Sequence, residues 1–423
     1  MEKDGSKPTK YPGIVQLSNG RYKVTIDYGR DEVTGKQRKT HKTVDTLKEA
    51  RALQGQNADA KRFNRTTGIS GKVLFKDALV DYNATYEKDW SMSYRTMKHN
   101  QEKRMLAYFG DKDVRTISTL DIEAFFKWCQ EPHEGFQKEL CNNTIGKYRT
   151  HLSDIWVFMK KNKQKYGISE NVVSDAKIGK IEKYEATTLT PEQIKYLLTY
   201  VTHCEEDYST FALLGIPALV GVRRGELCGL QWGDIDFENK IIDIQRQRDE
   251  INSQIVESVP KMGNPDGKSR FEKRQRYSAL PDKLAELLLV IKANQESILE
   301  RPVTASDYVY VTKKNMVSGT LPRPGKVSKR WGELQKRCNE VRKNKGLEEF
   351  PIVRLHDLRH SFISMCLNGG VNQLQVSANC GHTFSDRHLS TTIKTYWHDN
   401  QDRTELREFL NRTFQDANIN VVF

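Results

Sequence analysis

The sequence predicts a multidomain fold with three parts: a small three-stranded β-sheet with one helix, an all-α helical bundle, and a larger, mainly α (α+β) domain with a small β-hairpin sheet. The length of 423 residues suits two or three domains, each with its own core. The hydrophobic period changes from two near the N-terminus to three and four after residue 73. A polar stretch, residues 178–188, has the composition of a linker. We therefore expect domains at 1–70, 71–180 and 181–423.

The first domain, residues 1–70, shows the period-two pattern of β-strands. Its predicted strands are Gly13–Leu17, Arg21–Tyr28 and Lys36–Val44, separated by turn residues. Thr46 and Glu49 have the spacing of a capping box and open a helix through about residue 63. With 15 Lys/Arg against 8 Asp/Glu in this domain, one sheet face is expected to be basic. That face is either a solvated lysine-rich surface or a sheet that enters the major groove of DNA.

Residues 71–180 have the apolar spacing of helices. Apolar residues recur at intervals of three and four from Phe75 to Tyr86. Further candidate helices are Met97–Phe109, Leu120–Cys129 and Thr144–Lys161. Tyr148, Trp156 and Phe158 in the last of these are expected in the core, while basic residues on the opposite faces suit a surface that faces DNA.

The third domain begins with Thr190 as N-cap and Pro191 in the first helical turn. From there to about residue 415 the pattern is mostly helical, interrupted by a hairpin-like segment, Lys240–Leu280. The tail from Thr404 repeats apolar residues at helical spacing. This tail either folds onto its own domain or docks on a neighbouring protomer.

The bulk properties favour a polyanionic partner, because the net charge is +13 and the pI about 9.2. The longest apolar stretch, Phe211–Val222, has about half the length that a bilayer requires, so no membrane span is expected. Seven scattered cysteines without a CxxC pair indicate reduced thiols of a cytoplasmic protein. No zinc spacing, acidic metal cluster or phosphate-binding glycine loop is visible, so we expect no metal and no cofactor.

Moving a phosphodiester between alcohols requires a nucleophile, cations for the developing charge, a proton acceptor and a proton donor. The third domain contains candidates for each. An apolar helix ends at Gly221 and presents Arg223, which Glu226 could hold. The other candidates, in chain order, are His356 and Arg359 one helical turn apart, His382 after Gly381, and Tyr396 a further 14 residues on. Each candidate alone has an ordinary explanation: a solvated arginine, a surface H-x-x-R pair, or a packed tyrosine.

Taken together and in this order, the set resembles the signature of tyrosine recombinases, in particular the integrases of temperate phages and integrative conjugative elements. The segments GVRRGELCGLQW (221–232), HDLRH (356–360) and TYWH (395–398) are typical of that family. The resemblance covers roughly residues 12–410. It implies an enzyme that integrates and excises a mobile element or phage genome in a bacterial cytoplasm, without metal or cofactor.

The resemblance also implies a role for each candidate. Arg223 and Arg359 would clamp the scissile phosphate and neutralise the transition state. His356 matches the family's general acid/base position, and His382 would donate a hydrogen bond to a non-bridging oxygen. Tyr396 would attack, giving a 3′-phosphotyrosine and a free 5′-hydroxyl.

Two features depart from the family pattern. The family places a general-acid lysine in a β-hairpin. Lys261, after a proline, is our choice, and Lys273 and Lys268 remain alternatives because the intervening turn is long. The 14-residue gap from His382 to Tyr396 is also longer than usual.

By the same resemblance, residues 1–70 would bind arm sites, 71–180 the core site, and 181–423 would form the catalytic domain with its C-terminal tail. The implied partners are double-stranded DNA with core and arm sites, further copies of the chain in a tetramer on DNA, and an accessory DNA-bending or directionality factor. The candidate DNA contacts are Arg21, Lys23, Arg38, Lys39, Lys147 and Arg149.

Two alternatives differ in function. A type IB topoisomerase-like enzyme would share the chemistry without exchanging strands between partners. A DNA-binding regulator on the same fold would lack the chemistry, and a nicked DNA substrate would then trap no covalent adduct.

Overall fold

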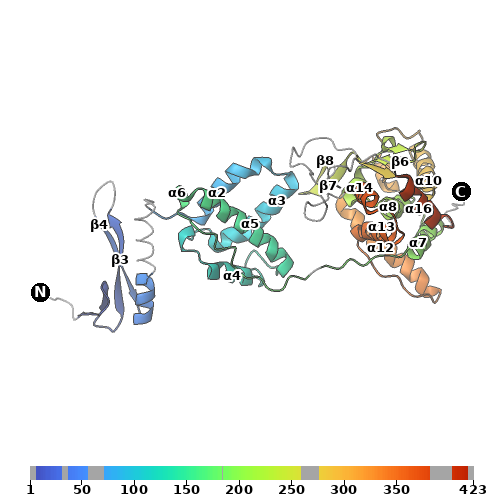
Figure 1. The fold of residues 1–423 in the computed structure, drawn as a ribbon. Coiled ribbons are helices and arrows are strands. Elements are labelled where there is room, and N and C mark those ends of the chain that lie inside the picture. The colour runs from blue at the N-terminus through green and yellow to red at the C-terminus, as the bar shows by residue number, and fades with distance from the viewer. Residues whose placement is uncertain are drawn as a thin grey trace. The chain divides into compact units, whose positions relative to one another are not determined.

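The structure is a computed structural model that describes residues 6–30, 37–55, 71–182, 184–258, 276–381 and 403–417 (Figure 1). The chain divides into two units, residues 1–183 and 184–423. The division falls inside the polar stretch 178–188 that the sequence marks as a linker. The described residues form three separate hydrophobic cores, two in the first unit and one in the second.

The N-terminal sheet is antiparallel and has the order β1-β2-β3-β4. Its strands are β1 (Lys7–Pro8), β2 (Ile14–Gln16), β3 (Tyr22–Arg30) and β4 (Gln37–Val44). The sequence predicted three strands, which is wrong, because the sheet has four. The extra strand, β1, is two residues long, too short to show any alternation in the sequence.

Strand register gives this sheet two different faces. Val24 pairs with Lys42 and packs with Ile14 against Ala50, which lies in the helical residues 47–55. The predicted capping box opens that helix, with hydrogen bonds of 3.2 and 3.3 Å between Thr46 and Glu49. The opposite face carries Lys23, Thr25 and Asp27, paired with Thr43, His41 and Lys39. The sheet therefore has an apolar face under a helix and a polar face rich in basic groups.

The helical part of the first unit surrounds an aromatic core. Its helices are α2 (Phe75–Tyr86), α3 (Met92–Phe109), α4 (Thr119–Trp128), α5 (Asn142–Lys161) and the short α6 (Lys163–Tyr166). Tyr148, Trp156 and Phe158 are buried in this core, as predicted. Helix α3 begins earlier than its apolar pattern suggests, because Ser91 caps it and accepts a hydrogen bond from the Tyr94 amide.

The second unit is built around α8, every residue of which is buried. Its helices are α7 (Pro191–Cys204), α8 (Ser209–Val220), α9 (Arg224–Gly229), α10 (Asp282–Leu299), α11 (Lys313–Ser318), α12 (Pro324–Asn344), α13 (Leu355–Asn368), α14 (Gln373–Cys380) and α16 (Thr404–Phe414). Helix α8 contacts α7, α10 and α13. The apolar stretch 211–222 thus lies at the centre of this core. No helix among the described ranges is long and apolar enough to cross a bilayer.

The tail helix α16 belongs to this same core. Leu406, Leu410 and Phe414 are fully buried, and α16 contacts α7, α10, α13 and β9 (Tyr277–Ala279). Residues 404–414 therefore fold onto their own domain, which is one of the two alternatives that the sequence left open for the tail.

The hairpin-like segment proves to be two small sheets. Strands β5 (Ile235–Asp236), β6 (Ile241–Asp243) and β9 form one sheet, and β7 (Gln247–Ile251) and β8 (Gln254–Ser258) form a separate hairpin. Asn252 and Ser253 make its tight turn with φ values of 49° and 64°. The sequence predicted one small hairpin sheet, whereas this region has two small sheets, because the long segment between β6 and β9 contains a hairpin of its own.

Candidate active site

Arg223 is held at the junction between α8 and α9. Helix α8 ends at Gly221, whose φ of +73° is left-handed, and a Cβ there would lie 2.6 Å from the Phe362 ring. Arg223 then becomes the N-cap of α9. Its Nη1 donates to Glu226 Oε1 at 2.8 Å, and its amide donates to Glu226 Oε2 at 2.7 Å. The predicted contact between Arg223 and Glu226 is present.

Arg359 enters the same region from α13, one turn after His356. It is 1% exposed, and its guanidinium donates to the carbonyl oxygens of Gly221 and Cys380. Burial lowers the pKa of Arg359 to about 10, so the side chain remains a cation at neutral pH. Its two acceptors are uncharged, so they orient the guanidinium without cancelling its charge.

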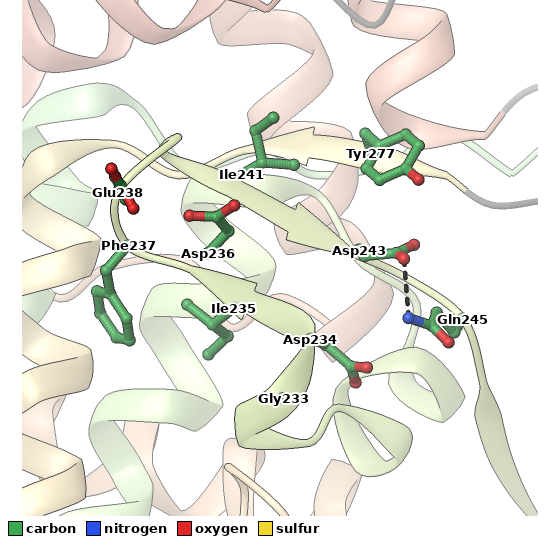
Figure 2. A pocket seen from close by; sticks show the side chains of 10 residues that line it. All are labelled: Gly233, Asp234, Ile235, Asp236, Phe237, Glu238, Ile241, Asp243, Gln245 and Tyr277. Atoms are coloured by element: carbon green, nitrogen blue, oxygen red, sulfur yellow. Dashed lines mark hydrogen bonds between the residues drawn. The ribbon is translucent and has the colours of Figure 1, made fainter. Parts of the chain in front are cut away.

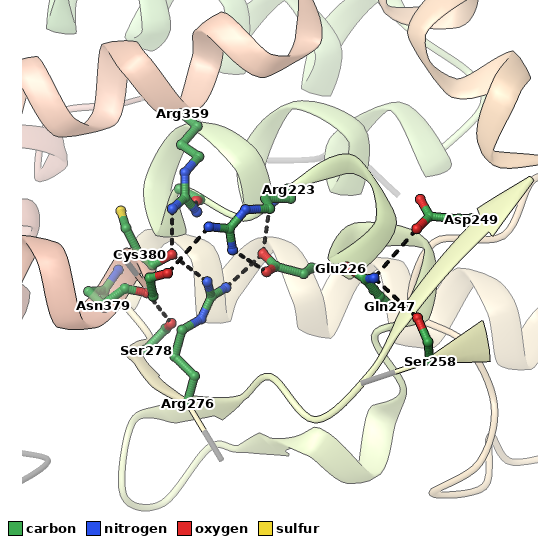
Figure 3. A network of polar contacts seen from close by, with 12 residues as sticks. Arg223, Glu226, Gln247, Asp249, Ser258, Arg276, Ser278, Arg359, Asn379 and Cys380 are labelled. Carbon is green, nitrogen blue, oxygen red and sulfur yellow. Dashed lines mark hydrogen bonds and ion pairs between the residues drawn. The ribbon is translucent and has the colours of Figure 1, made fainter. Parts of the chain in front are cut away.

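Glu226 is completely buried and binds a second arginine, Arg276, whose Nη2 donates to Oε2 at 2.8 Å (Figure 3). Burial alone would raise the pKa of Glu226, but Arg276 and then Arg223 hold it below the usual value. Our sequence reasoning missed Arg276. It lies in a run rich in Lys and Arg, residues 268–276, and nothing local distinguishes it from its neighbours.

The C-terminal end of α14 is where the three arginines meet (Figure 3). Arg276 Nη1 donates to the Cys380 carbonyl at 2.5 Å, and Arg359 donates to the same oxygen. Arg223 Nη2 donates to the Gly381 carbonyl at 3.3 Å. The last carbonyls of a helix lack intrahelical partners and carry partial negative charge, so they suit guanidinium donors. The next residue in the chain is His382.

Asn379 fixes this end of α14 to two other elements. Its Nδ2 donates to the Val220 carbonyl at 2.9 Å, and its Oδ1 accepts from the Ala279 amide at 2.9 Å. Asn379 is fully buried, so both bonds lie away from water. The ends of α8 and α14 and the strand β9 are therefore held together by one side chain.

His356 lies at the exposed edge of this arginine cluster, with its ring centre 5.1 Å from that of His360. Desolvation lowers the pKa of His356, and electrostatic interactions with His360, Arg359 and Arg223 lower it further, while Asp357 opposes them. The neutral imidazole is therefore favoured at pH 7, which is the form that accepts a proton.

The structure thus brings together Arg223, His356 and Arg359 from the predicted set. Lys261 and its alternatives Lys268 and Lys273, together with His382 and Tyr396, lie outside the described residues. Their roles stay predictions.

The predicted DNA contacts fall into two groups. Arg21 forms an ion pair with Asp45 at 2.6 Å, and Arg149 donates to the carbonyls of Val173 and Ser174. These two guanidiniums already have protein partners. Lys39 and Lys147 are exposed and Lys23 is partly exposed, while the side chain of Arg38 lies outside the described part of the chain.

A separate hollow lies on the β5-β6-β9 sheet and is acidic (Figure 2). Asp234, Asp236, Glu238 and Asp243 line it. Carboxylates at this density repel phosphate, so the hollow is a poor candidate for a DNA site. Within the ranges that the structure describes, no group of three or more His, Cys, Asp or Glu has the geometry of a metal site.

The model of the Phage integrase family matches residues 187–403. The ICEBs1 integrase of Bacillus subtilis (strain 168) is 24% identical over 91% of this chain and 95% of its own. A XerC-like tyrosine recombinase of Caldanaerobacter subterraneus subsp. tengcongensis is 25% identical over 97% of this chain and 100% of its own.

Two solved structures are similar in fold. The Tn1549 transposon integrase in complex with transposon right end DNA has a TM-score of 0.58 at 17% identity, covering 80% of this chain and 99% of that one. The lambda integrase tetramer bound to a Holliday junction has a TM-score of 0.50 at 17% identity, covering 90% and 98%. The fold that this chain shares with lambda integrase comprises a small antiparallel N-terminal sheet, a helical region and a largely helical domain with small sheets.

Glu226→Gln should destabilise the second unit by about 3–5 kcal/mol, because it leaves the buried guanidinium of Arg276 without its counter-charge. Urea unfolding would measure the change in free energy. Glu238→Gln is the matched control, since Glu238 is exposed. Equal unfolding midpoints for the two variants would contradict the role assigned to Glu226.

Proposed function

This chain belongs to the phage integrase family, and from that premise we propose that it is a site-specific tyrosine recombinase that cuts and rejoins DNA to move a mobile element. The observation that carries the proposal is the convergence of Arg223 and Arg359 on the carbonyls of Cys380 and Gly381, immediately before His382. Two guanidiniums fixed at one point provide a site for a phosphodiester.

The two arginines would bind the non-bridging oxygens of the scissile phosphate. A guanidinium is planar and offers paired donors that match a phosphate, and it keeps its charge at any physiological pH. As the attacking oxygen adds to phosphorus, negative charge grows on the non-bridging oxygens. Donors that are already oriented stabilise this charge without reorganising.

In the reaction that we propose, the Tyr396 hydroxyl attacks phosphorus and the bond to the 5′-oxygen breaks. The products are a 3′-phosphotyrosine and a free 5′-hydroxyl, so the bond energy is conserved for rejoining. His356 takes part as general acid/base, and His382 donates a hydrogen bond to a non-bridging oxygen. Lys261 protonates the departing 5′-oxygen.

Double-stranded DNA is the proposed partner, with a tetramer of this chain as the active assembly. Lambda integrase is similar in fold and was crystallised as a tetramer on a Holliday junction, and the Tn1549 integrase as a complex with transposon DNA. In this chain, the polar sheet face that carries Lys23 and Lys39 suits a second DNA site, away from the one being cut. An accessory DNA-bending or directionality factor completes the proposal.

Tyr396→Phe should abolish formation of a covalent protein–DNA adduct while leaving DNA binding nearly intact, because it removes only the attacking hydroxyl. Denaturing electrophoresis after incubation with a nicked attachment-site duplex measures the adduct, and native electrophoresis measures binding. An adduct in this variant would identify a different nucleophile. Absence of the adduct in the wild-type protein on its own attachment site would favour a DNA-binding regulator instead.

The general acid can be identified with a substrate whose scissile 5′-bridging oxygen is replaced by sulfur. A thiolate leaves without needing a proton, so Lys261→Ala should cleave this substrate near the wild-type rate and the normal substrate far more slowly. Lys268→Ala and Lys273→Ala serve as controls. Rescue of either of these, but not of Lys261→Ala, would move the role to that lysine.

In a plot of cleavage rate against pH, the fall of the rate on the acidic side (the acidic limb) should lie below pH 6.5, the ordinary pKa of histidine. The reason is that the folded protein lowers the pKa of His356. As the pH falls through that lowered value, the imidazole gains a proton and can no longer accept one, so the rate declines. A single-turnover pH profile measures the limb. The His356→Gln variant should lack it, and a limb at or above pH 6.5 would contradict the lowered pKa.

Lys23→Ala combined with Lys39→Ala should weaken binding to flanking DNA sites and make it less dependent on salt. Loss of two phosphate contacts should reduce the slope of log K against log salt by about 1.8. Lys42→Ala is the control, because Lys42 pairs with Val24 on the other face of the sheet. Binding titrations at several salt concentrations measure the slope, and equal slopes for the two variants would exclude this face as a DNA surface.

A further inference from the structure

The proposed reaction assigns no role to Arg276. It immediately precedes β9, and only 2% of its surface is exposed. Its own carbonyl accepts a hydrogen bond from the Ile244 amide at 2.8 Å, which fixes its backbone. A buried arginine is costly unless its charge is paired, so its surroundings should explain why it is there.

Two acceptors hold the Arg276 guanidinium, and each of them also binds an arginine of the proposed site. Glu226 Oε2 accepts from Arg276 Nη2 at 2.8 Å and from the Arg223 amide at 2.7 Å. The Cys380 carbonyl accepts from Arg276 Nη1 at 2.5 Å and from Arg359. Arg276 is therefore linked through one shared atom to each of the two arginines.

We infer that Arg276 is a positioning residue for the strand-transfer reaction: it neutralises Glu226, so that Arg223 keeps its charge for the phosphate, and it fixes the Cys380 carbonyl ahead of His382. The inference rests on the proposed function. No contact with DNA is assigned to Arg276, because its guanidinium binds Glu226 and the Cys380 carbonyl, and it acts through these neighbours.

The charges explain why Glu226 needs a second arginine. With Arg223 alone, Glu226 would form a neutral pair, and the arginine would attract a phosphate only weakly. With Arg276 added, two guanidiniums share one carboxylate and leave one net positive charge. Glu226 can then orient Arg223 without cancelling the charge that the transition state needs.

The side chain of Arg276 packs closely against Gly381. A Cβ on residue 381 would lie 2.8 Å from both Cδ and Nη1 of Arg276, and the φ of Gly381 is +64°. Glycine is therefore required before His382 for two independent reasons, its backbone conformation and the close approach of Arg276.

Strand β9 carries Arg276 to this point. Ser278 Oγ donates to the Asn379 carbonyl at 3.0 Å, and the Ala279 amide donates to Asn379 Oδ1 at 2.9 Å. These bonds fix the strand to α14 without involving charge. Replacing Arg276 should therefore remove the charge and the carbonyl contact while the strand stays attached.

The test compares Arg276→Met and Arg276→Lys with a matched control, Arg248→Met. Arg248 is equally buried, at 3% exposed, but it donates to the Cys228 carbonyl and packs on the Tyr308 ring. Among the described residues it makes no hydrogen bond or ion pair with Glu226 or α14. Each variant is mixed, at saturating protein, with the attachment-site duplex that the wild type cleaves. Two duplexes are used: one with a normal scissile phosphodiester, and one with a methylphosphonate, which carries no negative charge.

On the phosphodiester, Arg276→Met should cleave about 100-fold more slowly than the wild type, while its affinity for DNA stays within about twofold. On the methylphosphonate, its deficit relative to the wild type should shrink to about 10-fold or less, because an uncharged linkage needs less positive charge. Arg276→Lys keeps the charge but cannot hold both acceptors, so its deficit should be smaller and similar on both linkages. Arg248→Met should cleave both substrates like the wild type.

Equal deficits of Arg276→Met on the two linkages would overturn the inference and leave Arg276 as a support of the fold. Cleavage by Arg276→Met at the rate of Arg248→Met would also overturn it. If Arg276→Met does not fold, as shown by lost DNA binding and a lost thermal transition, Arg276→Lys decides, and a wild-type rate in that variant counts against the inference. If the wild type itself cleaves neither duplex, the proposed function fails.

Discussion

The central constraint in the second unit is that three guanidiniums and one carboxylate meet at the end of one short helix. Like charges at this spacing repel, and burial makes the repulsion stronger. The arrangement holds because Glu226 supplies a counter-charge and the last carbonyls of α14 accept from all three arginines. The α8–α9 junction, the N-terminal part of α13, the end of α14 and the start of β9 must therefore all meet at this point, although they are far apart in the sequence.

Features encoded by neighbouring residues could be predicted from the sequence. The Thr190 cap, the alternation of β3 and the apolar spacing of α2 each reflect a local rule, and the structure has all three. Arg223 and Glu226 were also predictable as a pair, since the carboxylate follows the arginine by three residues just after an apolar helix. The order of the candidate catalytic residues along the chain indicated the family before any geometry was known.

Features that depend on distant contacts could not be predicted. Arg276 becomes distinct from the nearby arginines only when β9 reaches Glu226, 50 residues earlier in the chain. The apolar spacing of α16 was equally compatible with its own domain and a neighbouring one, and tertiary packing decided between them. The second sheet arose because a long segment between β6 and β9 contains its own tight turn, at Asn252 and Ser253.

The kinds of acceptor in this cluster bear on how it could serve catalysis. Arg359 is oriented by neutral carbonyls, which fix a guanidinium in its plane and leave its charge intact. Arg223 is oriented by a carboxylate, a stronger acceptor that would cancel its charge if it acted alone. The second arginine on Glu226 removes that conflict, so that firm orientation and net positive charge coexist. An arrangement of this kind stabilises an anionic transition state because its donors are in place before the charge appears.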